Sequence, residues 1–379
     1  MFGALVVSAV FFLVLSQAFI LRVPEIVTQV FRPIIVVAML LRMSHDRIVV
    51  ASNYRTFALL AALYCAFVML FQKFNIYELT RASAVILYLL MFWSVSGVRW
   101  NRKEIQLIMF SCFLAAFVCA IAIFVSNDPT DLHVGTSGEM EMLGVSINRN
   151  KNAYAFSLGT IIGLAYILYG NIRFKPLILC VTAVTAYALL YSQCRGAFFC
   201  AVAGIVVLVF GLLLRIRRKN PNGFIVYSIL FILSCIILYY LIKNSELSRL
   251  VDGDSTSGRD DSIKHAWELF LQSDLLGKIF GHGFGFEGEN SEEIGAHLVY
   301  VSYLLSIGII GTFLITLMFV QAFRNIRGPI PLALWSAAFL RTFFEGLDYY
   351  IYIPLILSMV ISTYVKRRGR KGNELFGVI

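Results

Sequence analysis

Residues 197–219, which read AFFCAVAGIVVLVFGLLLRIRRK, decide the fold class of this chain. The uncharged part, 197–214, has nearly the length of the roughly 20 apolar residues that a helix needs to cross a bilayer. Four basic residues follow within 215–219, and clusters of Lys and Arg mark the cytoplasmic side of a span. The stretch therefore predicts a transmembrane helix that ends in the cytoplasm.

The composition of the whole chain agrees with this prediction. Of the 379 residues, 59% are hydrophobic and 14% charged, whereas a soluble domain is about half apolar and about one quarter charged. We therefore expect residues 1–379 to form a single transmembrane domain. The net charge of +10 fits Lys and Arg on the cytoplasmic side, so we expect contact with the lipid bilayer and not with nucleic acid.

Apolar runs predict an all-α fold with about twelve transmembrane helices and both chain ends in the cytoplasm. This orientation follows because more than half of the 32 Lys and Arg residues fall in alternate loops. The opposite, periplasmic side then holds a smaller loop, 126–151, and a large loop, 243–296. The expected spans are 3–21, 26–42, 56–72, 81–98, 105–125, 152–170, 175–192, 197–214, 224–242, 297–319, 330–346 and 350–365.

The sequence also limits the chemistry. The seven cysteines form no CxxC pair and have no histidine at ligand spacing, which argues against a metal site or a disulfide framework. No P-loop, GxGxxG or HExxH motif occurs, so the sequence gives no sign of cytoplasmic ATP chemistry. We therefore expect neither a metal nor a cofactor.

Four polar segments fall on the expected outer side, and the first is 144–152. Asn150, Lys151 and Asn152 lead there into an apolar helix. Unpaired backbone N–H groups carry partial positive charge at a helix start, which makes it a ready phosphate site. Asparagine is also an ordinary helix cap, so a capped helix with a solvated loop is the alternative.

The second segment is 192–196, a tight turn between two apolar helices that contains Arg195. An arginine is expensive to bury in a membrane. Its planar guanidinium can hold a phosphate through two hydrogen bonds. The alternative is that Arg195 extends to the lipid headgroups.

The third segment is 255–271, which from Arg259 onward predicts an amphipathic helix lying along the outer surface, with Lys264 as a further basic candidate. A cation at a helix start opposes the helix dipole, so Arg259 suits a place beside an anion. A salt bridge with Asp260 is the alternative. The residues expected on the apolar face are Ile263, Trp267, Phe270 and Leu271.

The fourth segment is a glycine-rich loop, 281–285, followed by acidic residues and by His297 at the start of the next span. A histidine there can be neutral near pH 7 and accept a proton. The plainer interpretation is an interface histidine bonded to a backbone carbonyl. Near the outer end of the eleventh span, Arg341 and Glu345 could line the same cavity or form an intrahelical ion pair.

Taken together, these segments suit a site for a lipid-linked diphosphate. Cations would neutralise the diphosphate as it leaves, and a base would take the proton of an attacking hydroxyl. Arg81 is a further outer cation.

The four segments resemble motifs of the bacterial O-antigen ligase and polymerase superfamily. In that superfamily an Asn-rich helix start, a Ser/Thr-x-x-Arg-Gly/Ala turn, a Ser-Gly-Arg before an amphipathic helix and a glycine-rich loop before a histidine follow one another. The matching residues here are 148–152, 192–196, 257–259, 281–285, His297 and 308–311, in the same order.

The resemblance implies an inverting, metal-independent glycosyltransferase in the bacterial inner membrane, with its active site facing the periplasm. Donor and acceptor would be undecaprenyl diphosphate-linked oligosaccharides, with a chain-length regulator as a further partner. Arg195 and Arg259 would hold the diphosphate, and His297 would act as the base or orient the acceptor. We expect the other substrate-binding residues among Asn150, Lys151, Asn152, Lys264, Arg341, Glu345 and Arg81.

One departure bears on the type of enzyme. Ligases of the superfamily usually carry His-x-His-Asn or His-Asn at the fourth motif, whereas this chain has Ala296-His297-Leu298. The departure favours a polysaccharide polymerase over an O-antigen ligase that passes the glycan to lipid A core. It also leaves a carboxylate, Glu287 or Glu345, as an alternative base. A polysaccharide transporter without covalent chemistry is the alternative from another class.

Overall fold

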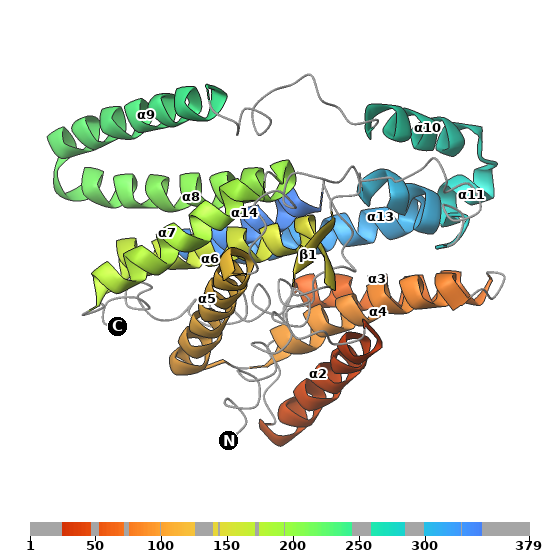
Figure 1. Ribbon diagram of the computed structural model, residues 1–379. Coiled ribbons are helices and arrows are strands. Elements are labelled where there is room, and N and C mark those ends of the chain that lie inside the picture. The colour runs from red at the N-terminus through yellow and green to blue at the C-terminus, as the bar shows by residue number, and fades with distance from the viewer. Residues whose placement is uncertain are drawn as a thin grey trace.

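The fold is described from a computed structural model, in which helices account for nearly all of the described residues (Figure 1). Its helices contain the long apolar runs of the sequence, because in a bilayer a helix satisfies its own backbone hydrogen bonds. The residues that the structure describes are 25–46, 53–71, 76–98, 100–125, 139–142, 145–170, 174–192, 194–244, 259–284, 299–326 and 328–342.

The helices form two groups that pack mainly within themselves (Figure 1). The α6 group contains α5 (Arg102–Val125), α6 (Arg149–Tyr169), α7 (Lys175–Tyr191), α8 (Arg195–Lys219), α9 (Pro221–Lys243) and α14 (Pro329–Arg341). The α13 group contains α2 (Glu25–Asp46), α3 (Asn53–Leu70), α4 (Ile76–Gly97), α10 (Arg259–Gln272), α11 (Leu275–Phe280) and α13 (Val299–Asn325).

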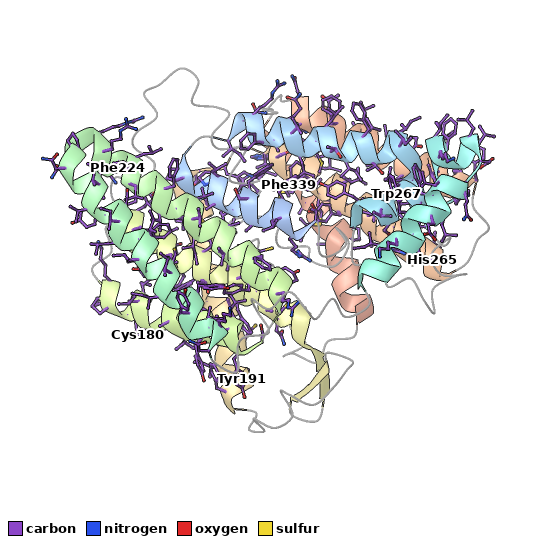
Figure 2. The ribbon with its side chains drawn as sticks, turned by 90° about the horizontal axis from the view of Figure 1, so that it is seen from above. Cys180, Tyr191, Phe224, His265, Trp267 and Phe339 are labelled. Carbon is purple, nitrogen blue, oxygen red and sulfur yellow. The ribbon has the colours of Figure 1, made fainter. Side chains whose placement is uncertain are left out.

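A continuous hydrophobic core joins the two groups. Helix α14 packs on α6 and α8 on one side and on α13 on the other, and the Arg42–Glu104 ion pair joins α2 to α5. The ring of Phe339 lies 5.9 Å from that of Phe319 on α13, and the ring of Trp335 lies 4.8 Å from that of Phe323 (Figure 2). These aromatic contacts run in antiparallel register along α13 and α14.

Neighbour contacts fix the direction of each helix in the α6 group. Ile161 of α6 lies against Gly204 of α8, and Tyr169, further along α6, donates to the carbonyl of Leu208 over 2.6 Å. The two helices therefore run parallel. Gly204 also faces Ala333 of α14 while Gly211 faces Pro329, so α8 and α14 are antiparallel. The starts of α6 and α8 consequently lie at the same end of the bundle as the last turn of α14, and this is called the site end below.

Helix α13 is interrupted at Gly308, whose φ of 65° and ψ of −172° are not helical. Tyr300 nevertheless lies 3.3 Å from Thr342, just beyond α14. Phe319 of α13 and Phe339 of α14 are in contact, and Thr342 is only about 5 Å beyond Phe339 along α14. In a straight α13, however, Tyr300 would be about 28 Å from Phe319 along the helix axis, too far to reach Thr342. The chain therefore bends back at Gly308, and the expected single span 297–319 is wrong in this respect.

The bend is held by the glycine-rich loop after α11. The backbone N–H of His282 donates to the carbonyl of Leu305 over 2.7 Å, and that of Gly283 donates to Ser306 over 2.9 Å. These carbonyls belong to the last turn before Gly308, where a helix end needs outside donors. Gly281 and Gly308 meet backbone to backbone at this point, and both have positive φ. The segment 299–307, which we call the returning half-helix, is thus capped by a loop from the predicted periplasmic segment.

The structure supports a polytopic helical membrane protein. By length and composition, five of the described helices could cross a membrane: α3, α5, α6, α8 and, if its two halves on either side of Gly308 are counted together, α13. Shorter apolar stretches occur in α2, α4, α7 and α9. The expected ranges between 26–42 and 224–242 each coincide with a helix, while 3–21 and 350–365 lie outside the described residues. The total of twelve, and the orientation, stay predictions.

One element departs from the expected all-α fold. Strands β1 (Glu139–Met142) and β2 (Val145–Asn148) form an antiparallel hairpin with Glu139 opposite Asn148. The hairpin lies within the predicted smaller loop 126–151 and runs directly into α6. Short paired strands satisfy the backbone of a loop that has no helical run of its own.

Candidate functional site

The first and second polar segments come together at the site end. Helices α6 and α7 are antiparallel, because Gly163 faces Thr182 and Thr160 lies 3.4 Å from Thr185. Asn152 lies eight residues before Thr160, about 12 Å along α6. That distance brings Asn152 level with Ser192, in the turn between α7 and α8. The two motifs are therefore neighbours across the bundle, as a shared site requires.

Asn152 is the most informative residue of the first segment. Its side chain is 2% exposed, and Oδ1 has no hydrogen-bond partner among the described residues. A buried amide oxygen without a donor costs free energy, so it suits a place where a ligand supplies one. Asn150 and Lys151 belong to the first turn of α6, but their side chains lie outside the described residues.

Arg195 begins α8. It is half-buried and already interacts with neighbours. The preceding residue, Cys194, provides no side-chain cap to the helix. A helix start carries unpaired N–H groups and partial positive charge, which disfavours a cation unless an anion is nearby. Arg195 therefore stands at an uncapped helix start, a position that a nearby anion would stabilise.

Arg259 takes the same position at the start of α10, although its side chain lies outside the described residues. Helix α10 packs on the returning half-helix through Ala266 and Phe270, which meet Val301 and Leu305. The third segment therefore packs against the returning half-helix.

The residues on the expected apolar face of α10 differ in their burial within the protein. Phe270 is buried and Ile263 half-buried, whereas Trp267 and Leu271 are 45% and 53% exposed (Figure 2). The face of α10 that packs on α13 includes Ala266, whose small side chain lets the two helices approach closely. Lys264 is exposed on the same helix.

Arg81 connects α4 to the returning half-helix. Its Nη2 donates to Oγ of Ser302 over 3.1 Å. Ser302 is buried and stands five residues after His297, which itself lies outside the described residues. The structure therefore brings one predicted binding residue, Arg81, to the first turn of the helix that His297 precedes.

Arg341 lies where the two helix groups meet at the site end, a place we call the seam. Its side chain is 6% exposed, and its guanidinium lies 4.7 Å from the ring centre of Tyr154 on α6. Oγ1 of the next residue, Thr342, donates to the hydroxyl of Tyr300 on the returning half-helix over 3.3 Å and to the carbonyl of Phe339 over 2.6 Å. Arg341 is also close enough to Tyr88 of α4 to interact with it electrostatically. Glu345 lies outside the described residues.

His282, in the glycine-rich loop, has a structural position. Its Nε2 lies 2.7 Å from Oγ of Ser273, and its backbone N–H caps the returning half-helix. Asp274 caps α11 by accepting from the N–H of Gly277 over 2.9 Å. The two ends of this loop are thus fixed on α10–α11 and on α13.

Several neighbours of the predicted residues carry no sequence signal of their own. Tyr154, Tyr300, Thr342 and Ser302 lie in apolar helices, where polar groups of this kind usually bond to the backbone. Only the fold shows that Tyr154 lies against Arg341, that Ser302 accepts from Arg81 and that Tyr300 meets Thr342, the residue after Arg341. Among the residues that the structure describes, no three His, Cys, Asp or Glu side chains are grouped to hold a metal ion.

The fold and the site define a polytopic helical membrane protein with polar and cationic groups collected at one end of its bundle. Comparison with known families then gives a direct match: residues 178–316 fit the O-antigen ligase family. The match confirms the resemblance to the O-antigen ligase and polymerase superfamily over this stretch, and it supports glycan transfer of that general type. No curated protein matches the chain.

Proposed function

We propose that the protein is a polysaccharide polymerase that transfers a growing glycan from undecaprenyl diphosphate to a lipid-linked repeat unit. The observation that carries the proposal is the convergence at the site end. Arg195 comes from the α6 group, whereas Arg81 and the helix that begins with Arg259 come from the α13 group. A substrate between the groups would meet cations from both, an arrangement that suits a diphosphate.

The chemistry follows from these charges. The acceptor hydroxyl attacks the anomeric carbon of the donor, the bond from that carbon to the diphosphate oxygen breaks, and the configuration inverts. Arg195 and Arg259 offset the negative charge that develops on the leaving diphosphate. His297 takes the proton of the attacking hydroxyl. No cofactor enters this scheme.

The site end is proposed to face the periplasm at the outer surface of the bacterial inner membrane. The supporting feature is the opposite end of α8, where Arg217, Arg218 and Lys219 form its last turn. Basic residues at the end of a span favour the cytoplasm, which places Arg195 on the other side.

Two other functions remain as alternatives. An O-antigen ligase would use the same donor site and pass the glycan to lipid A core. A transporter would move the glycan without breaking a bond, and the interruption at Gly308 is the feature that favours it, since interrupted helices are common in transporters.

Reconstitution with lipid-linked repeat units separates the three. A polymerase lengthens the lipid-linked glycan in proteoliposomes that contain no other acceptor. A ligase leaves chain length unchanged until lipid A core is added. A transporter changes the side of the membrane on which the glycan is found, and its length stays the same.

His297→Ala is expected to lower turnover by about 100-fold to 10,000-fold, the usual contribution of a general base, and to leave donor affinity within a few-fold. Turnover would be followed by release of undecaprenyl diphosphate and affinity by binding of the donor to the same preparation. His265→Ala, on α10, is the matched control and should match the unchanged protein. A loss confined to donor affinity would make His297 a binding residue and assign the base elsewhere.

Chelation should leave activity intact, because cations of the chain itself would neutralise the diphosphate. The measurement is glycan extension in proteoliposomes with an excess of EDTA and again after addition of Mg²⁺ or Mn²⁺. Activity that disappeared with EDTA and returned with a divalent ion would contradict the metal-independent scheme.

A further inference from the structure

Arg341 is buried at the end of α14 and contacts a second helix, while the residue after it contacts a third. The guanidinium lies 4.7 Å from the ring centre of Tyr154 on α6, and Oγ1 of Thr342 lies 3.3 Å from the hydroxyl of Tyr300 on α13. These helices are distant in sequence, so the tertiary fold and not one local motif brings the groups together.

The stacking geometry determines what the guanidinium can bind. Tyr154 lies 4.7 Å from Arg341 Cζ, the distance of a cation–π contact. A guanidinium held through its face directs its N–H groups along its own plane, where they suit a two-pronged bond to a carboxylate or phosphate. The hydroxyl of Tyr300 accepts from Oγ1 of Thr342 over 3.3 Å, a bond that does not use the hydrogen of the Tyr300 hydroxyl itself. The guanidinium and this hydroxyl together form a set that suits an anionic oxygen.

The location of Arg341 connects this set with the proposed reaction. Tyr154 stands two residues after Asn152, and α14 runs antiparallel to α8 so that its last turn is at the Arg195 end. Tyr300 stands two residues before Ser302, which bonds Arg81. Arg341 is thus between the part of the site formed by α6 and α8 and the part formed by α4 and α13.

We propose that Arg341, with Tyr300, binds an anionic oxygen group of the lipid-linked substrate at the seam. The group is either a phosphate of the diphosphate or a carboxylate on the sugar beside it. The inference rests on the proposed function for the identity of the substrate, but it concerns binding and does not require turnover.

The experiment measures equilibrium binding to the full chain in nanodiscs, with two probes: undecaprenyl diphosphate, and the sugar-bearing lipid-linked donor extracted from cells. Arg341→Gln should weaken binding by roughly 10-fold to 100-fold, the loss expected for a hydrogen bond to a charged group. If both probes bind more weakly, the anion is the diphosphate. If only the sugar-bearing donor does, the anion is a sugar carboxylate.

Arg55→Gln is the matched control. Arg55 of α3 is 7% exposed, donates to the carbonyl of Trp93 over 3.0 Å and lies over the ring of Trp93, which is on the opposite half of α4 from Arg81. Its loss should lower stability without changing affinity for either probe. Tyr300→Phe keeps the ring and the buried cation, so it tests the site should Arg341→Gln not fold, and we expect a several-fold weaker affinity.

Three outcomes would overturn the proposal. The first is unchanged affinity for both probes in Arg341→Gln. The second is unchanged affinity in Tyr300→Phe when Arg341→Gln does not fold. The third is a stability loss without an affinity change that Glu345→Gln reproduces, since that would identify an intrahelical ion pair. Absence of glycan transfer by the unchanged protein would instead refute the proposed function and leave the binding result standing.

Discussion

Arg195→Gln is expected to reduce glycan extension by at least about 100-fold while the protein still folds in the membrane. Removal of one preorganised donor from a developing negative charge typically costs about 100-fold to 1,000-fold in rate. The position of Arg195 strengthens this expectation. The start of α8 has no side-chain cap, so its first backbone N–H groups are also available to the diphosphate that Arg195 would bind. Arg195→Lys, which keeps the charge and loses the planar fork, should retain part of the activity.

The measurement is the length distribution of glycan in cells that lack the chromosomal gene, at equal levels of tagged protein. Arg218→Gln is the matched control, because Arg218 is exposed in the last turn of the same helix. It should give the normal distribution. Arg259→Gln should behave like Arg195→Gln, and normal chain lengths in either variant would refute the assignment of these two arginines to the diphosphate.

Gly308→Ala is expected to lower the free energy of unfolding by about 3 kcal/mol or more. A side chain at φ +65° costs about 1 to 2 kcal/mol, and its Cβ would also overlap the carbonyl of Ile279 and the N–H of Gly281. Overpacking against a rigid neighbour adds about 1 to 3 kcal/mol. The readout is the Tm of detergent-solubilised protein, which should fall markedly together with the yield of monodisperse protein.

Gly223→Ala provides the matched control for this effect. Gly223 lies in the first turn of α9, where an added Cβ would meet only the side chain of Asn220, at 3.1 Å and beyond. Its Tm should change little. If Gly308→Ala were as stable as Gly223→Ala, the described packing of the glycine-rich loop against α13 would be incorrect.

Most of the helices could be predicted from the sequence, because a span must be a long apolar run and such a run can be recognised without knowledge of the fold. Helices α6 to α8 begin and end within a few residues of their expected ranges. Apolarity does not distinguish a straight helix from one that bends back, however. The reversal at Gly308 depends on donors from His282 and Gly283, which are distant in the chain.

The candidate site was predictable to a similar degree. Arg195, Arg81, Asn152 and Arg341 could be chosen because charged or amide groups are costly in a membrane and therefore conspicuous in its helices. Their neighbours were not predictable, because Tyr154, Tyr300 and Thr342 look like ordinary residues of apolar helices. The contact of Ala266 with α13 was not predictable either, because a single alanine is significant only once its partner helix is known.

The contact between Gly281 and Gly308 has a consequence for how changes at the two positions combine. A Cβ at Gly281 would meet the backbone of Ser306 and Gly308, and a Cβ at Gly308 would meet the backbone of Ile279 and Gly281. Separating the two backbones relieves both overlaps at once. The free-energy costs of the two substitutions are therefore not independent, and the double variant loses less stability than the sum of the single ones. Both substitutions therefore disrupt one and the same contact, that between the glycine-rich loop and α13.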